Sequence, residues 1–463
     1  MRLAEDVVRA GYFWVPENPD KKLPGTLRIL DGGEIQLEVL GNFDPDFSGF
    51  QENMSMPKIL GQIEKEALVT LDNCFYRRKN YSFGTLSKST ISASRALCGI
   101  LINNAEPLFN QFRFSIEGLD EWLQISGITV QQDFKNKSTQ INYVPPDKAQ
   151  FKLNDEFSLA FIFGWSIPFA RSVTEAKITQ QAYVELRAHK PVELKKFIYI
   201  AFRFTNFLSL ALDEPTSLSQ VTIASDDIVR EVSEDKQIPV QINLYYQSLP
   251  FSETKPKLAQ HSLLFTFPQV RHKFESILMA WMNIYEVIGP SLNLYFASKA
   301  GEHKYLDGKF LSLAQSLETF HRRTSDETLM DKAVFDGLID QLLTTCSEDK
   351  RKWLESKLMF GNELSLGNRL KRLLDPFKSQ FGTSAKREKL IRKIVDTRNY
   401  LTHYSKDLEN KAAKGRDLWE ICLKMEVAFQ FQLLTEIGFD KPAIQKIITD
   451  SESISRKLSQ SDL

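Results

Sequence analysis

The sequence predicts an α+β protein of two domains, with an N-terminal antiparallel β-sandwich or barrel-like domain followed by a C-terminal all-α helical bundle. The chain has 463 residues. A single hydrophobic core rarely supports a chain of this length, so we expect two domains. Apolar and polar residues alternate up to about residue 250, and from about residue 268 apolar residues recur every three or four positions. The first period is typical of strands and the second of helices. We expect domains at 1–257 and 258–450, and a flexible polar tail at 451–463.

The clearest strand signal is a hairpin near the start of the chain. Residues 26–30 and 34–40 are separated by Asp31, Gly32 and Gly33, and a Gly-rich turn between two strand-like runs is typical of a hairpin. Short alternating runs separated by Gly, Pro, Asn and Asp indicate an antiparallel sandwich or barrel. The segment 249–257 contains two prolines and mixed charge, so we expect the linker there. Further alternating pairs are Phe112 and Phe114, Ile141 and Tyr143, Val184 and Leu186, and Ile242 and Leu244.

The second half of the chain has the pattern of a bundle with about four long helices. A first helix from Phe274 should stop or kink at Gly289-Pro290, because proline removes a backbone donor. A helix near Ser384, its expected N-cap, carries the candidate site. The last long helix is apolar on most sides, which suits the centre of a bundle. Helical stretches are expected at 274–288, 310–320, 330–343, 353–359, 364–374 and 418–437.

Composition excludes several classes of protein. Lys plus Arg and Asp plus Glu both number 59, which argues against coating of nucleic acid by bulk charge but allows a local basic groove. No segment resembles a signal peptide or a membrane span, and we expect a cytoplasmic protein without membrane partners. The four cysteines lie far apart, with no Cys-x-x-Cys and no nearby His pair, so neither a disulfide framework nor a zinc site is expected. They are Cys74, Cys98, Cys346 and Cys422.

Arg398 and His403 are the candidate catalytic pair. Arg398 projects into an apolar stripe that includes Ile394 and Leu401, and a cation there is costly unless something pairs with it. At about 100° per residue, His403 lies roughly 140° further round the same helix. The two side chains therefore cannot converge on one atom of a straight helix. Either the helix ends between them, or a second copy of the segment completes the site.

Two stretches of the chain resemble one family. Arg398-Asn399-Tyr400-Leu401-Thr402-His403 is similar to the Arg-x4-6-His motif of HEPN ribonucleases, and its flanks, with Thr402 and Tyr404, resemble the ApeA type found in bacterial phage defence. Independently, Gly11-Tyr12-Phe13-Trp14-Val15-Pro16, followed by Pro24-Gly25-Thr26-Leu27, resembles the start of the ApeA N-terminal domain.

The resemblance implies an activity. It implies a HEPN-like bundle that cleaves RNA without a metal or other cofactor and leaves a 2′,3′-cyclic phosphate and a 5′-hydroxyl. It also implies abortive infection, with tRNA as one candidate substrate, a homodimer or higher homo-oligomer, and a phage-derived trigger that the β domain senses or restrains. In such a site His403 serves the proton steps. Arg398 binds the phosphate, which its planar fork suits, and Asn399 orients the phosphate or His403.

A second helix offers auxiliary residues. His321 projects onto the apolar stripe of its helix, with Glu318 one turn earlier. Glu318 could pair with Arg398, while His321, Arg322 and Tyr404 are candidates for contact with RNA. The Glu-x-x-His spacing also occurs in di-iron carboxylate proteins, but no second copy is present, so a metal site is not expected. The structural alternative is that a neighbour satisfies His321 and that Arg322 is solvated.

Two other functions remain open from the sequence. HEPN-like bundles also serve as binding domains, so Arg398 and His403 could grip an RNA, a nucleotide or a protein partner without cutting. A purely structural two-domain adaptor is the third possibility. In that case Arg398 would snorkel or pair with a carboxylate, and His403 would favour the helix dipole at a C-terminus.

Overall fold

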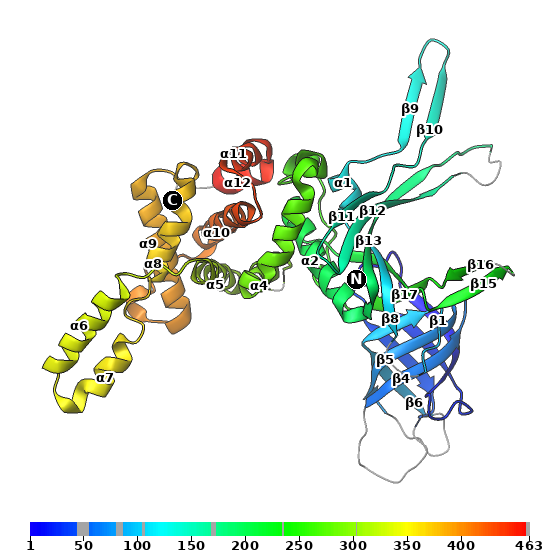
Figure 1. Ribbon diagram of the computed structural model, residues 1–463, viewed down its shortest axis with the longest axis horizontal. Helices are drawn as coiled ribbons and strands as arrows, with labels where there is room; N and C mark the ends of the chain where they lie inside the picture. Colours follow the sequence, from blue (N-terminus) through cyan, green and yellow to red (C-terminus); the bar gives the residue numbers. More distant parts are fainter. Residues whose placement is uncertain are drawn as a thin grey trace, which may run out of the picture. The chain divides into compact units, whose positions relative to one another are not determined.

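The computed structural model describes residues 1–43, 55–79, 87–103, 107–167, 173–233, 236–301 and 303–459. The chain forms two compact units, Met1–Met282 and Asn283–Leu463, the first rich in strands and the second helical (Figure 1). The division falls after Met282, whereas the sequence predicted it after Lys257. Residues beyond Lys257 belong to the first unit because their aromatic rings pack there: Phe267 and Phe274 lie 5.6 and 5.7 Å from the ring of Trp122.

A closed antiparallel β-barrel forms the core of the first unit. Strands pair in the ring β1–β2–β3–β6–β5–β4, and the pairing of β5 with β6 closes it. The predicted hairpin is confirmed: β2 pairs with β3, and the turn contains Gly32 and Gly33 with φ of 98° and 84°, which glycine adopts without steric cost. The barrel strands are β1 (Val7–Trp14), β2 (Leu23–Ile29), β3 (Ile35–Leu40), β4 (Ser55–Ile63), β5 (Ala67–Arg78) and β6 (Lys88–Ala93).

A second group of strands continues from the barrel. Residues 75–78 of β5 pair with β6, and residues 69–72 pair with β7, which begins the extension. The predicted strand residues Phe112, Phe114, Val184 and Leu186 are all fully buried in it. In order across the sheet these strands are β7 (Arg95–Cys98), β17 (Ile242–Tyr246), β14 (Leu218–Ala224), β8 (Leu108–Ile116), β13 (Thr179–Glu193), β12 (Phe157–Ser166) and β11 (Ala149–Lys152).

One long helix in this unit was not predicted. Helix α2 (Leu194–Leu212) packs on the sheet, where Phe197 stacks on Phe112 with ring centroids 5.8 Å apart. Thirteen of its nineteen residues are apolar, and in so dense an apolar run periodicity alone does not separate a helix from the buried strands on either side of it. The unit also contains short helices α1 (Leu119–Leu123), η1 (Gln260–Ser262), α3 (Phe267–Val270) and η2 (Arg271–Lys273).

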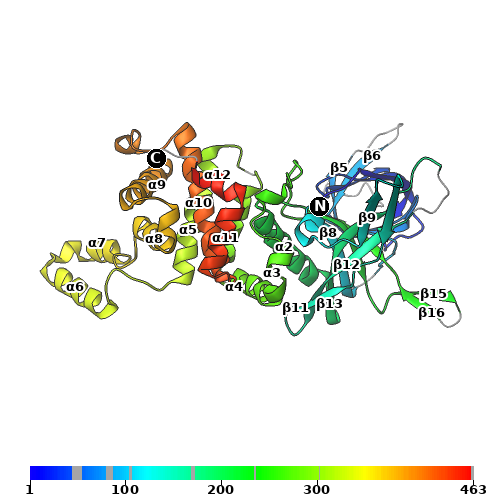
Figure 2. The same cartoon turned by 90° about the horizontal axis from the view of Figure 1, so that it is seen from above.

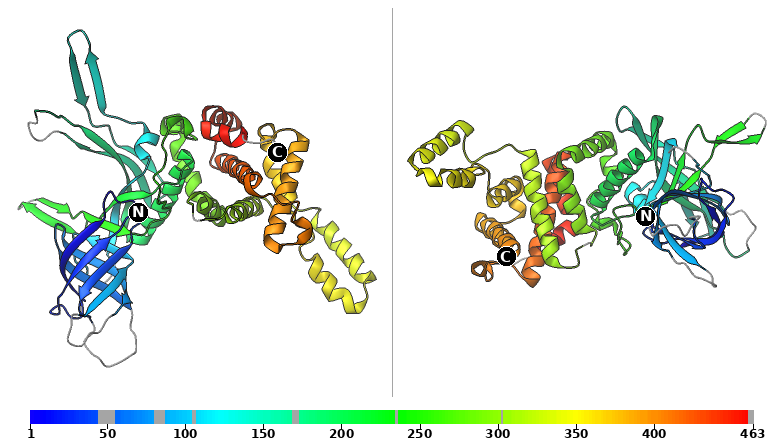
Figure 3. Two further views of the ribbon diagram at one scale, coloured as in Figure 1. Left: turned by 180° about the vertical axis from the view of Figure 1, so that it is seen from behind. Right: turned by 90° about the horizontal axis from the view of Figure 1, so that it is seen from below.

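Two hairpins extend away from the first unit (Figure 3). They are β9 (Ile128–Asp133) with β10 (Ser138–Tyr143), and β15 (Val229–Ser233) with β16 (Lys236–Pro239). The predicted strand at Ile141 belongs to the first of these hairpins, and Ile141 is exposed rather than buried. In this segment the alternation of apolar and polar residues correctly indicates a strand, but the strand is not part of a hydrophobic core.

The second unit is the predicted helical bundle. Helix α4 (Phe274–Lys299) leaves helical geometry at Ile288, just before Pro290, so the predicted kink is confirmed. Helix α10 (Gly415–Glu436) is buried on most sides, as predicted, and packs along α5 (Figure 2). The other helices are α5 (Leu306–Thr324), α6 (Lys332–Thr345), α7 (Glu348–Leu358), α8 (Leu366–Leu374), η3 (Asp375–Gln380), α9 (Ser384–His403), η4 (Lys406–Leu408), α11 (Lys441–Asp450) and α12 (Glu452–Ser459).

The predicted flexible tail is a packed helix over most of its length. Helix α12 buries Ile454 completely, and Lys457 forms an ion pair with the buried Glu426 of α10. The prediction was wrong because a short helix needs few apolar residues when a neighbouring helix supplies the partner. Residues 460–463 lie outside the described residues. Across the described ranges no helix is both long and apolar enough to cross a bilayer.

Candidate functional site

Helix α9 carries the Arg398–His403 motif. Thr383, one residue before the predicted Ser384, is the N-cap and accepts a hydrogen bond from the backbone of Lys386 at 3.4 Å. The helix is continuous from Ser384 to His403 and ends where Tyr404 adopts a left-handed conformation, with φ of 51°. The helix therefore does not end between Arg398 and His403, which excludes one of the two explanations that the sequence left open.

Arg398 lies at the junction of α9 with α5. Its Nη2 atom is 3.6 Å from Oε2 of Glu318, the partner expected from the sequence. Its Nη1 atom donates a hydrogen bond of 3.2 Å to Oδ1 of Asn399. The Arg398 side chain is 34% exposed and that of Glu318 only 12%. A largely buried carboxylate thus holds the guanidinium at one end, while part of the guanidinium remains open to solvent.

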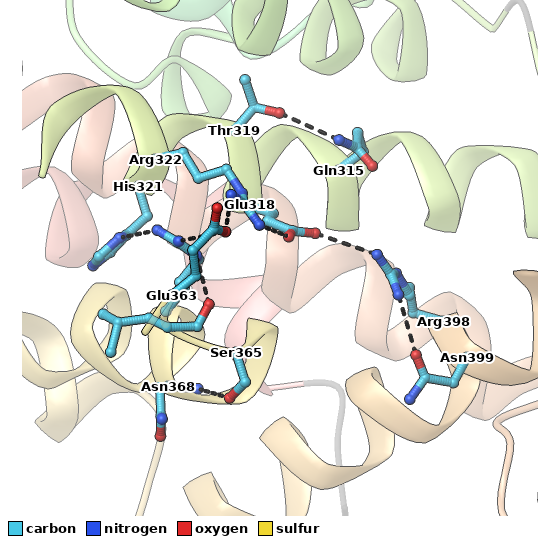
Figure 4. A network of polar contacts seen from close by, with 12 residues as sticks. Gln315, Glu318, Thr319, His321, Arg322, Glu363, Ser365, Asn368, Arg398 and Asn399 are labelled. Carbon is cyan, nitrogen blue, oxygen red and sulfur yellow. Dashed lines mark hydrogen bonds and ion pairs between the residues drawn. The ribbon is translucent and has the colours of Figure 1, made fainter. Parts of the chain in front are cut away.

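Glu318 belongs to a chain of alternating charges (Figure 4). Its Oε1 atom accepts a hydrogen bond of 3.2 Å from Arg322, and Arg322 also pairs with Glu363 in the segment between α7 and α8. Glu363 in turn lies 3.8 Å from Nη2 of Arg369 on α8. This chain of charges consists of three arginines and two glutamates, so its net charge is positive, and Arg398 lies at its exposed end. Such a surplus favours an anionic ligand.

His321 lies at the buried end of this chain. It is 4% exposed, and its Nδ1 atom is 3.1 Å from Nη1 of Arg369. Burial and the charge of Arg369 lower the pKa of His321 below its ordinary 6.5, so Nδ1 is the unprotonated atom that accepts from Arg369. The structure therefore places His321 beneath the surface as a partner of Arg369, and not where it would touch RNA.

His403 and Tyr404 lie at the C-terminal end of α9, and both are exposed. Within the described residues, His403 forms no hydrogen bond or ion pair, and the Tyr404 ring contacts only Tyr400, at 5.5 Å. Because α9 is continuous, His403 remains about 140° round the helix from Arg398. One chain therefore brings Arg398, Asn399, Glu318 and Arg322 together, and leaves His403 and Tyr404 apart from them.

Sequence reasoning missed three residues of this region. Arg369 is 4% exposed and lies on the apolar face of α8 with Leu370 and Leu373, the same signal that singled out Arg398. Glu363 lies outside any helix, so no periodicity marks it. Thr397 is fully buried, and its Oγ1 accepts a hydrogen bond of 2.8 Å from the backbone of Ala413, which fixes the segment after His403 to α9.

The geometry of the helical unit agrees with the comparison to known families. Residues 8–281 match the family described as ApeA N-terminal domain 1, and residues 311–443 match Apea-like HEPN. The second match contains the Arg398–His403 motif and the charge chain on α5, α8 and α9. No curated protein and no solved structure matches the chain. The first match alone covers more than half of the sequence, and the chain therefore belongs to the ApeA family, in which an ApeA N-terminal domain precedes an ApeA-like HEPN domain.

Proposed function

We propose that this protein is an RNA endonuclease that acts in abortive infection, with Arg398 and His403 at its catalytic site. HEPN domains are generally nucleases, and the ApeA type implies a nuclease-like role in defence against phage. One observation carries the proposal: Glu318 holds the Arg398 guanidinium at one end, and the rest of it is open beside Asn399. A fixed, partly exposed guanidinium is suited to binding a phosphodiester.

Histidine, arginine and asparagine side chains supply every group that this cleavage of RNA requires. A base removes the proton from the ribose 2′-hydroxyl, the 2′-oxygen attacks phosphorus, and the bond from phosphorus to the 5′-oxygen breaks. An acid returns a proton to the 5′-oxygen, which leaves a 2′,3′-cyclic phosphate and a 5′-hydroxyl. We assign the proton steps to His403, because histidine is suited to both roles near neutral pH. Arg398 stabilises the charge that builds on the phosphate oxygens, and Asn399 orients that phosphate.

The site is shared between two copies of the chain in this proposal. The continuous helix α9 keeps Arg398 and His403 on different sides, so a homodimer that apposes two α9 helices would supply Arg398 from one copy and His403 from the other. Tyr404, exposed beside His403, would then contact a base of the RNA by stacking. A higher homo-oligomer built from such dimers has the same site.

The N-terminal barrel and its extension are assigned to control. An RNase active at all times would kill its own cell, so cleavage must be held off until infection. We assign to the first unit the sensing of a phage-derived trigger or the restraint of the helical unit, and tRNA is our first candidate for the RNA that is cut.

The decisive experiment compares purified full-length wild type with Arg398→Ala and His403→Ala on total RNA and on tRNA, with EDTA present. We expect cleavage in the wild type and a loss of about 10²–10⁴-fold in His403→Ala, the range for removing a proton-transfer group. In Arg398→Ala we expect a loss of about 10²–10³-fold, the range for removing a donor that stabilises charge in the transition state. Arg392→Ala, an exposed arginine of the same helix, and His272→Ala, an exposed histidine of the first unit, are the matched controls.

Two results would contradict the proposal. Cleavage that survives His403→Ala would remove His403 from the mechanism. A wild type that is inert in vitro, and no more toxic on expression than Arg398→Ala, would favour a module that binds without cutting. An inert wild type that is toxic where the variant is not would instead show an enzyme held off until triggered.

A further inference from the structure

The first unit contains a cavity whose lining indicates a binding site for a small molecule, independent of RNA cleavage. Its volume is about 670 Å³, within the range of sites for small molecules. It lies on the face of the extension sheet opposite Phe112 and Phe114, which point to the core. Its polar lining includes Arg113, Tyr183, Thr222, Asn243, Tyr245 and Lys255.

Strand register brings three of these side chains into one row. Arg113 on β8 lies opposite Thr222 on β14, and Thr222 lies opposite Asn243 on β17. Residues directly opposite each other in an antiparallel sheet share a face, so a guanidinium, a hydroxyl and an amide project side by side. A bulge in β14, where Gln220 has φ of 50°, places Gln220 to accept a hydrogen bond of 2.7 Å from the Tyr183 hydroxyl.

Arg113 has no anionic partner in the described part of the chain. Its Nε atom is buried without a hydrogen bond, and so is the Thr222 hydroxyl oxygen. The cross-strand neighbour Glu185 is engaged elsewhere, since it accepts from Lys148 at 2.7 Å and from Gln111 at 2.6 Å. A half-buried cation without a counter-ion is costly, so this side of the cavity favours an anion.

The other charges around the cavity do not supply that anion. Arg2 and Glu117 line it too, but they bond each other at 2.8 Å, and Arg2 also binds Asp31 and the backbone of Ser252. Lys255 is exposed and forms no ion pair among the described residues. After the Arg2–Glu117 pair is set aside, the side chains that line the cavity keep two positive charges, on Arg113 and Lys255.

We propose that this cavity binds a nucleoside monophosphate. Two cations with a hydroxyl and an amide donor match a phosphate dianion better than a single carboxylate. Tyr183 on β13 and Tyr245 on β17 line the cavity on either side of Arg113 and Thr222. A tyrosine ring offers an aromatic surface for a planar base, and base–aromatic stacking tolerates any base. The phosphate lies at Arg113 and Thr222. The base lies toward Tyr245, because the Arg113 guanidinium already lies over the ring of Tyr183, 6.0 Å from its centroid.

The test measures ligand binding to the full-length protein by calorimetry and thermal shift. The probes are the four ribonucleoside 5′-monophosphates, inorganic phosphate and adenosine, each up to about 5 mM, a range that detects weak sites by linkage. We expect at least one nucleotide to bind and to raise the melting temperature, inorganic phosphate to bind more weakly, and adenosine not to bind.

Substitutions in the cavity lining test whether the nucleotide binds there. Arg113→Gln should weaken nucleotide binding roughly tenfold or more, and Lys255→Gln should weaken it less, because an exposed charge is screened. Arg230→Gln and Lys257→Gln, exposed residues of the same unit that do not line the cavity, should bind as the wild type does. Thr222→Val keeps the side-chain shape and tests the site should Arg113→Gln fail to fold.

Three results would overturn the proposal. No binding of any nucleotide or of phosphate would mean that the cavity holds only water. Nucleotide affinity unchanged in Arg113→Gln, or in Thr222→Val should Arg113→Gln fail to fold, would place the ligand elsewhere. Adenosine or inorganic phosphate that binds as tightly as the nucleotides would refute the nucleoside monophosphate class. Since RNA cleavage is not the readout, this outcome and the outcome for the nuclease are independent.

Discussion

The Arg398 guanidinium on α9 and the Glu318 carboxylate on α5 form an ion pair, with Nη2 and Oε2 3.6 Å apart. Glu318 is itself held by Arg322, so the carboxylate cannot follow Arg398 if that side chain moves. The pair fixes Nη2 of the guanidinium, Nη1 donates to Asn399, and the side chain remains 34% exposed. Glu318 is therefore a positioning residue for Arg398.

Replacement of Glu318 by Gln should lower RNA cleavage about tenfold, less than the loss in Arg398→Ala, because the amide keeps the shape but not the charge that holds Arg398. Steady-state kinetics on one defined RNA would show the loss. Glu327→Gln is the matched control, since Glu327 also pairs with an arginine, Arg372 at 2.5 Å, outside the charge chain. Full activity in Glu318→Gln would mean that Arg398 needs no anchor.

The sequence indicated Glu318 as a possible partner of Arg398, because Arg398 projects onto an apolar stripe, where a charge must find a partner, and Glu318 lies at the flank of the apolar stripe of another long helix. It also predicted the β2–β3 hairpin and the kink in α4, which depend on Gly32, Gly33 and Pro290 within a few residues. These features are local. Each follows from one turn residue or one helical period, without knowledge of distant neighbours.

Features that depend on distant neighbours could not be predicted. The division of β5 between β6 and β7 joins segments that no local pattern links. Glu363 enters the charge chain from a segment without periodicity, and α12 is held by Lys457 reaching Glu426 on another helix. His321 was predicted to face the bundle, and it does, but only the structure shows that Arg369 satisfies it.

The stability of the helical unit should fall as the pH drops below 6.5, in part because of His321. The pKa of His321 is lowered in the folded chain by burial and by Arg369, while the unfolded chain binds the proton near 6.5. The unfolded state therefore gains protons first and is favoured as the pH falls below 6.5, until the folded chain binds the proton as well. Urea unfolding across that range should show a shallower pH dependence in His321→Asn, whose oxygen still accepts from Arg369.

His272→Asn serves as the control, because His272 is exposed on the first unit and should leave the pH dependence of unfolding unchanged. A His321→Asn variant with the wild-type slope would show that His321 does not contribute to it.

Glu426 should be the ion-pairing residue whose loss most destabilises the helical unit. It is fully buried on α10, with Lys309 at 2.6 Å, Lys457 at 3.3 Å and Lys299 at 3.7 Å. Burial alone would raise the pKa of Glu426, but the three lysines lower it to about 2. Glu426→Gln leaves buried lysines without a counter-charge and should cost on the order of 3 kcal/mol in the free energy of unfolding.

The Glu426 carboxylate should also make the free energy of unfolding fall at acid pH. Because its pKa is 4.5 in the unfolded chain and about 2 in the folded one, its contribution is complete above pH 4.5 and is lost as the pH falls toward 2. Glu409→Gln, which breaks the exposed pair with Lys414, should change the free energy of unfolding by less than about 0.5 kcal/mol. Equal effects of the two substitutions would contradict the assignment.

A mixture of two inactive variants should regain activity if two copies of the chain share the site. Arg398→Ala and His403→Ala are co-unfolded and refolded, or co-expressed, so that about half of the dimers contain one chain of each kind. In such a dimer one site receives Arg398 and His403 from different chains and is intact, while the other lacks both. The mixture should therefore recover about one quarter of wild-type cleavage.

The control is the double variant with both substitutions in one chain, mixed with wild type in equal amounts. Its mixed dimers have no intact shared site but would retain one intact site if a single chain supplied both residues. A shared site thus predicts about one quarter of wild-type activity in this mixture, from the wild-type dimers alone. A site within one chain predicts about one half, and it predicts no recovery at all when the two single variants are mixed. Together the two mixtures decide between a dimeric and a monomeric site without any assumption about how α9 packs on its partner.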